Sequence, residues 1–89
     1  MRSRRRLIVH GHVHGVGFRA AAARAASSRG VSGWVRNLPD GTVEVVLEGD
    51  EDAVASVERL CQEGPRGAAV IRVEAANEPL EGLLRFEIR

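Results

Sequence analysis

Two glycines and an arginine stand where an extended run of the chain gives way to a helical one. Leu7-Ile8-Val9 precedes them, and an alanine-rich string at 20–26 follows. Gly15 and Gly17 let the backbone turn and bring its N–H groups close to a ligand without an intervening Cβ. The first amides of a helix have no internal acceptor and carry partial positive charge, and Arg19 adds a planar two-donor fork. These residues predict a binding site for an anion of phosphate size.

A second short run, residues 33–41, ends a β-rich segment with Asn37 just before a turn at Pro39. Taken alone, Asn37 is better explained as a cap of that turn than as a functional residue. Together with the run at 11–19, however, the segment resembles the paired signature motifs of the acylphosphatase family, small enzymes that hydrolyse carboxyl-phosphate bonds. The resemblance covers the chain from about Leu7, and it reverses the preference for a turn cap.

The resemblance implies a role for each matching position. The backbone of the loop would cradle the phosphoryl group of an acyl phosphate, Arg19 would bind its oxygens, and Asn37 would hold the attacking water. The loop residues are His14, Gly15, Val16, Gly17, Phe18 and Arg19. The products would be a carboxylate and inorganic phosphate, which would also inhibit. Two positions depart from the family: His14 stands where glutamine is frequent, and Ala20 where an aromatic residue is.

The expected chemistry needs few protein groups. An acyl phosphate expels a carboxylate whose conjugate acid has a pKa of about 4–5, so it leaves without a general acid. Charge in the transition state lies on the phosphoryl oxygens, which amides and an arginine can stabilise. No metal ion or cofactor is required. The alternative is a non-catalytic module that holds phosphate or a nucleotide; such a module needs Arg19 but no water-positioning Asn37.

Other reactive side chains have simpler explanations. His10, His12 and His14 share one face of the first strand, but same-face neighbours lie about 6.5–7 Å apart, so all three cannot easily meet one metal ion. Solvent-facing positions are favoured for them, although two could share a metal. Cys61 lies on the apolar stripe of a predicted helix, which indicates a buried, inert thiol. Cys61 and Arg66 are also one residue short of the spacing expected of a thiol phosphatase.

The periodicity of apolar residues predicts the elements that position these groups. Strands are expected at 7–13, 31–38, 42–48, around 71–74 and at 84–88; helices are expected at 17–29 and 50–63, and a turn at 38–41 joins two strands into a hairpin. The order β-α-β-β-α-β predicts an α+β, ferredoxin-like two-layer sandwich. Two helices would cover one face of a four- to five-stranded, mainly antiparallel sheet, whose other face would lie in water.

Length and composition limit the remaining possibilities. The 89 residues predict a single domain over 1–89 with a net charge of +1, so the whole chain is no polyanion binder. Four arginines within residues 1–6 are expected to form a flexible, solvated terminus rather than a nucleic-acid arm. No secretory signal or membrane-spanning run is evident, and the single cysteine favours a reducing compartment. We therefore expect a cytoplasmic monomer without nucleic-acid or membrane partners.

Overall fold

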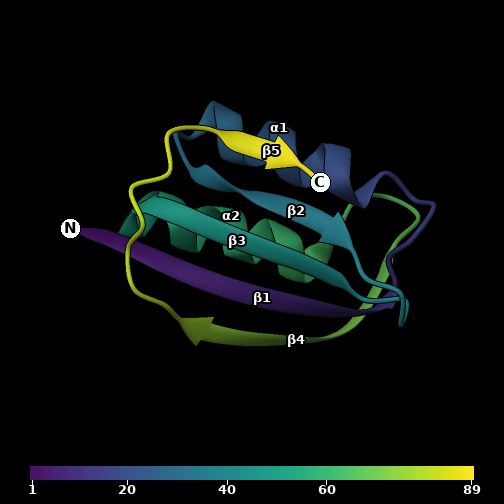
Figure 1. Cartoon of the computed structure of the whole chain (residues 1–89). Coiled ribbons are helices and arrows are strands. Elements are labelled where there is room, and N and C mark those ends of the chain that lie inside the picture. Colours follow the sequence, from purple (N-terminus) through teal and green to yellow (C-terminus); the bar gives the residue numbers. More distant parts are fainter.

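Two helices pack on one face of a five-stranded sheet in the computed structural model, which describes residues 1–89 (Figure 1). The elements are β1 (Arg2–His12), α1 (Phe18–Ser28), β2 (Ser32–Asn37), β3 (Val43–Asp50), α2 (Glu51–Glu63), β4 (Ala69–Asn77) and β5 (Phe86–Ile88). The strand order is β4-β1-β3-β2-β5, and every neighbouring pair is antiparallel except β2 and β5. The predicted ferredoxin-like α+β fold is confirmed.

The core lies between the sheet and the two helices. Alternate residues of β1, β2 and β3 face the helices, and these positions are almost entirely aliphatic because they are packed away from water. Small side chains on α1 let that helix pack closely against the sheet, while α2 contributes larger ones. The buried core residues of the helices are Phe18, Ala22, Ala26, Val54, Val57 and Cys61.

The ends of both helices agree with the predictions to within one residue. α1 is followed by Gly30, whose φ of 67° suits a glycine beyond a helix C-terminus. α2 begins after Asp50 with two acidic residues in its first turn, which complement the positive end of the helix dipole. The side chain of Asp50 makes no capping hydrogen bond, so its carboxylate acts there through charge alone.

The expectation of a flexible basic N-terminus is wrong. Residues 2–6 form the first half of β1 and pair with β3 on one side, and Arg5 and Arg6 also pair with β4 on the other. The side chain of Arg4 is only 8% exposed and forms ion pairs with Glu48, Glu78 and Glu81. Because these carboxylates are distant in sequence, the run of arginines resembled a solvated end when read alone.

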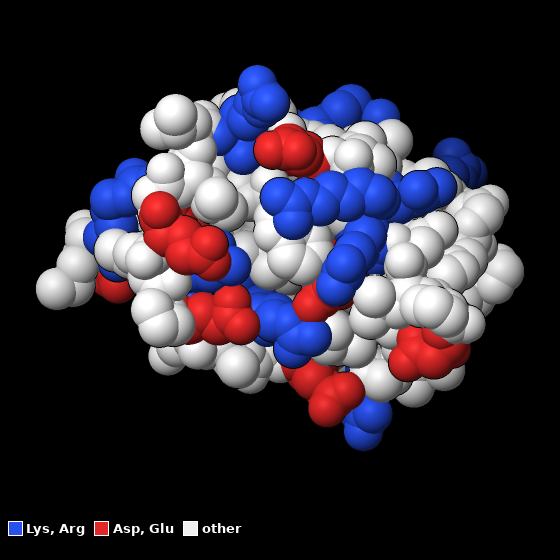
Figure 2. All heavy atoms as spheres, in the orientation of Figure 1, with Lys and Arg blue, Asp and Glu red and all other residues white.

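The open face of the sheet is less exposed than predicted. Glu44 and Glu48 of β3 are both buried, although they alternate with the core residues. Arg6 and Arg36 each form an ion pair with Glu44 and cover it. Figure 2 views this face and shows arginine and acidic side chains interleaved across it. Long arginine stems therefore shield the middle of the sheet from water on the side that the helices leave uncovered.

The C-terminal strand is shorter than expected. β5 spans only Phe86–Ile88, and Leu84 is 96% exposed instead of belonging to the strand. β5 lies parallel to β2 with Val35 opposite Ile88, which brings the end of the chain next to the strand that carries Asn37. None of the helices is long and apolar enough to cross a membrane.

Candidate active site

The loop between β1 and α1 holds its backbone amides without internal acceptors. No amide from His14 to Ala20 donates to a backbone carbonyl, and the first such bond of the helix runs from Ala21 N to Gly17 O at 3.0 Å. Gly15 and Gly17 have φ values of 71° and 77°, a region that side chains disfavour. The first turn of α1 carries no acidic residue. These amides are therefore available to an external anion.

Arg19 and Asn37 line one cavity of about 270 Å³ beside this loop. Arg19 lies on the first turn of α1, and Asn37 is the last residue of β2, so different elements supply them. The Arg19 side chain forms no ion pair with any acidic residue of the chain. The complete lining is Val13, Gly15, Gly17, Phe18, Arg19, Ala20, Asn37 and Ile88.

The turn after Asn37 is closed by a different residue. Oδ1 of Asp40 accepts hydrogen bonds from Oγ1 of Thr42 at 2.6 Å and from its amide at 3.0 Å, and these bonds lower the pKa of the Asp40 carboxyl. The amide of Leu38 donates to the carbonyl of Thr42 at 2.9 Å. The structure therefore assigns the capping role to Asp40, and the Asn37 carboxamide lies at the cavity.

Two residues of the predicted loop lie away from the cavity lining. The His14 side chain turns to the hairpin, where Nε2 lies 2.8 Å from the carbonyl oxygen of Thr42. Val16 is half-buried and packs against the core. The contribution expected from these two positions was their backbone, so their side-chain positions do not conflict with it.

Sequence reasoning missed Ile88 and gave Ala20 no place in the site. Ile88 reaches the cavity because β5 returns beside β2, a long-range parallel pairing that local periodicity does not reveal. Ala20 stands one residue after Arg19, is exposed, and belongs to the cavity lining. The position of Ala20 could have been inferred from the loop motif, whereas that of Ile88 could not.

The three histidines at positions 10, 12 and 14 do not meet at one point. His10 Nε2 lies 2.6 Å from a carboxylate oxygen of Glu74, a hydrogen bond that lowers the pKa of Glu74. His12 is exposed, and His14 contacts Thr42. No group of three histidine, cysteine, aspartate or glutamate side chains gathers at one point. The prediction of solvent-facing positions holds for His12, whereas His10 and His14 are half-buried.

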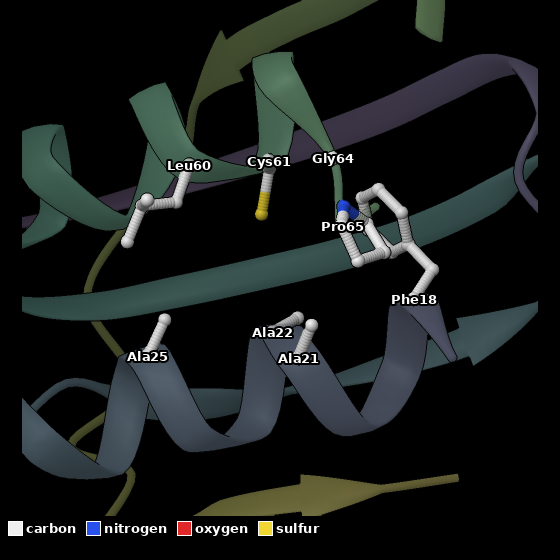
Figure 3. Close-up of a pocket in the computed structure, with 8 residues that line it drawn as sticks. All are labelled: Phe18, Ala21, Ala22, Ala25, Leu60, Cys61, Gly64 and Pro65. Carbon is white, nitrogen blue, oxygen red and sulfur yellow. The ribbon is translucent and has the colours of Figure 1, made fainter. Parts of the chain in front are cut away.

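A second cavity of about 140 Å³ lies between α1 and α2 (Figure 3). It is lined by alanines of α1, by Leu60, Cys61 and Pro65, and by Phe18, which also lines the first cavity. No charged side chain reaches it. Burial, together with the nearby charge of Glu58, raises the pKa of the Cys61 thiol to about 12. The burial of the thiol predicted from the sequence is thus confirmed, and a thiol that stays neutral is a poor nucleophile.

Comparisons with known proteins identify sequences and structures that are similar to this chain. A family model described as acylphosphatase matches residues 5–88. An acylphosphatase of Synechococcus sp. (strain JA-2-3B'a(2-13)) is 52% identical over 81 residues, which cover 91% of this chain and 86% of the relative. The crystal structure of an acylphosphatase from Bacillus subtilis superposes with a TM-score of 0.94 at 38% identity, covering 100% of this chain and 99% of the other.

The same fold also occurs inside a longer protein. The structure of T. kodakarensis HypF matches with a TM-score of 0.79 and 37% identity, and it covers 97% of this chain but only 11% of the HypF chain. The relatives of similar length are those named acylphosphatase. Sequence motifs, fold and comparisons agree, and the chain belongs to the acylphosphatase family.

Proposed function

We propose that this chain hydrolyses the carboxyl-phosphate bond of small acyl phosphates, releasing a carboxylate and inorganic phosphate. The observation that carries the proposal is the shared cavity of Arg19 and Asn37 beside the unpaired amides of the loop. These are the groups that phosphoryl transfer needs, since the reaction depends on positioning and on stabilising charge at the phosphoryl oxygens.

Each group has a distinct task in the proposed reaction. The loop amides and the Arg19 guanidinium bind the phosphoryl oxygens and stabilise the charge that they carry in the transition state. The Asn37 carboxamide holds a water molecule in line with the bond to the leaving carboxylate. The carboxylate departs without a proton, because a carboxyl group has a pKa of about 4–5 and its unprotonated form is stable at neutral pH. No carboxylate or imidazole lines the cavity, so the water transfers its proton to a phosphoryl oxygen of the substrate.

This mechanism requires no metal ion, because Arg19 and the amides supply the positive charge. Inorganic phosphate occupies the same donors as the substrate and is therefore proposed to inhibit competitively. We propose a monomer as the working unit, because the groups that the mechanism uses, Arg19, Asn37 and the loop amides, lie together at one cavity of a single fold. We place that monomer in the cytoplasm, because the one cysteine is a free thiol.

Release of inorganic phosphate from benzoyl phosphate, measured in EDTA, tests the proposal. We expect hydrolysis far above the background rate, unchanged by the chelator and inhibited competitively by added phosphate. If the protein binds phosphate but leaves benzoyl phosphate and acetyl phosphate at their background rates, the non-catalytic phosphate- or nucleotide-binding module is the correct function. Activity that disappears in EDTA would contradict the metal-independent mechanism.

A further inference from the structure

The His14 side chain connects the phosphate loop to the hairpin that carries Asn37. Its Nε2 atom lies 2.8 Å from the carbonyl oxygen of Thr42, and the contact is partly buried. A carbonyl oxygen only accepts hydrogen bonds, so Nε2 of His14 carries the proton and donates it. No backbone hydrogen bond links residues 13–17 to residues 37–42. The imidazole is thus the polar link between these two parts of the site.

The sheet itself does not hold the two parts together at this point. The pairing of β1 with β3 ends at Val9 opposite Val43, and β1 then continues along β4 with an irregularity between His10 and Gly11. Beyond Val43 the hairpin turn therefore has no ladder contact with the chain that leads into the loop. Figure 1 shows the turn and the loop at the same end of the sheet, where a side chain can bridge them.

The acceptor of this bond is rigidly held. The Thr42 carbonyl also accepts the amide of Leu38 at 2.9 Å, which closes the turn directly after Asn37. The amide and hydroxyl of Thr42 are both bound to Oδ1 of Asp40, and Thr42 is buried. Displacing Thr42 would therefore displace the residues on either side of it, including Val43, which pairs with Asn37.

We propose that His14 is a positioning residue, whose bond to Thr42 sets the separation between the loop amides and the Asn37 carboxamide. The proposal rests on the function proposed above. It assigns the side chain a role in aligning the water with the bound phosphoryl group, since misplacing a reacting group by about 1 Å can cost about a hundredfold in rate.

Three variants test the proposal by turnover of benzoyl phosphate and inhibition by inorganic phosphate. His14→Leu removes the donor, and we expect kcat to fall about 10- to 100-fold, with the phosphate inhibition constant changing less than about threefold. His14→Gln restores a donor and should keep kcat within about threefold of the wild type. His12→Leu is the matched control, because His12 is an exposed histidine at the end of β1, two residues before His14, and its side chain lies outside the site; its kcat should be unchanged.

A double-mutant cycle shows whether His14 acts through Asn37. If it does, His14→Leu has little further effect on kcat when Asn37 is already alanine, because the group being positioned is gone. If the double variant instead loses kcat by the product of the two single losses, the two residues act independently and the proposal is overturned. Melting temperatures of all variants separate a change of rate from a loss of folded protein.

Other outcomes identify which idea has failed. Turnover by His14→Leu equal to that of the wild type overturns the positioning role alone. Weakened phosphate inhibition in step with kcat also overturns it, since the loop itself would then have collapsed. A wild type that hydrolyses no acyl phosphate instead refutes the proposed function on which the inference rests.

Discussion

The molecule contains two runs of backbone amides next to an arginine, and only one of them holds an anion of its own. In the first, the amides of Glu81, Gly82 and Leu83 donate to the Glu48 carboxylate at 2.7–2.9 Å, and Arg4 lies 3.5 Å from it. We call this the filled nest. The open nest consists of the amides of residues 14–20 with Arg19, where no backbone carbonyl of the protein accepts these amides.

The two nests share their construction but differ in position. Both use a glycine at positive φ: 78° at Gly82 in the filled nest, and 71° and 77° at the two loop glycines of the open nest. They lie at opposite ends of the sheet (Figure 1). Glu48 is fully buried, whereas Arg19 is exposed at the edge of its cavity. The filled nest fastens the segment before β5, and the open one is accessible to a ligand.

The filled nest shows how consecutive amides and one arginine stabilise a negative charge, which is the task proposed for the open nest. Burial by itself would raise the pKa of Glu48, yet the amides of Glu81, Leu83 and Gly82 and the Arg4 guanidinium together lower that pKa below its usual value. Consecutive amides and one arginine therefore stabilise a negative charge even where water is excluded. The same donors in the loop lack an internal anion, which supports a phosphoryl group as their ligand.

Removing the arginine should damage the open nest most. We expect Arg19→Ala to lower kcat/KM for benzoyl phosphate about 10³-fold or more, because a guanidinium at the phosphoryl oxygens has effects of that order. The variant should also lose the rise in melting temperature that inorganic phosphate produces in the wild type. Arg24→Ala is the control, since Arg24 is exposed on the same helix outside the cavity. Equal losses of kcat/KM in both variants would contradict a specific role for Arg19 in binding the phosphoryl group.

Removing the carboxamide should separate binding from catalysis. We expect Asn37→Ala to lower kcat about 10²- to 10³-fold, because it loses a hydrogen-bonding group that positions the water. The phosphate inhibition constant should remain within about threefold of the wild type, since the amides and Arg19 are intact. Asn77→Ala, at the far end of β4, serves as the control. A variant that loses phosphate affinity as well as turnover would show that Asn37 belongs to the anion-binding group.

Neutralising the Glu48 carboxylate of the filled nest should lower the stability of the fold more than it lowers the catalytic rate. We expect Glu48→Gln to lower the free energy of unfolding at neutral pH by about 2–3 kcal/mol, since the amides and Arg4 lose their charged acceptor. Denaturant titration measures this loss. Glu87→Gln is the control, because Glu87 forms only an exposed surface pair and should change stability by less than about 1 kcal/mol.

The dependence of that loss on pH sharpens the test. Because folding lowers the pKa of Glu48 from 4.5, its stabilisation is complete above that value and disappears as the pH falls through the lower, folded-state pKa. The wild type and Glu48→Gln should therefore converge in stability at acid pH. A difference that stays constant from neutral to acid pH would show that the carboxylate charge is unimportant.

Local chemistry made much of this molecule predictable. The glycines and Arg19 at a strand-to-helix junction predicted the open nest, because the donors are consecutive in the chain and need no distant partner. The helices, the hairpin and the order of elements followed from periodicity and end signals in the same way. The role proposed for Asn37 did not follow from its neighbours in the sequence, and it depended on the pairing of two motifs.

Partners distant in sequence were decided only by the tertiary structure. The filled nest joins Arg4, Glu48 and residues 81–83, and neither the arginine run nor the isolated glutamate indicates it. The placement of Ile88 in the cavity and the bond from His14 to Thr42 likewise depend on which strands become neighbours. The sequence by itself determined the donors that we propose to bind an anion, because these belong to one short segment. The folded sheet decided which nest is filled by the protein's own carboxylate and which remains open, because that depends on long-range strand pairing.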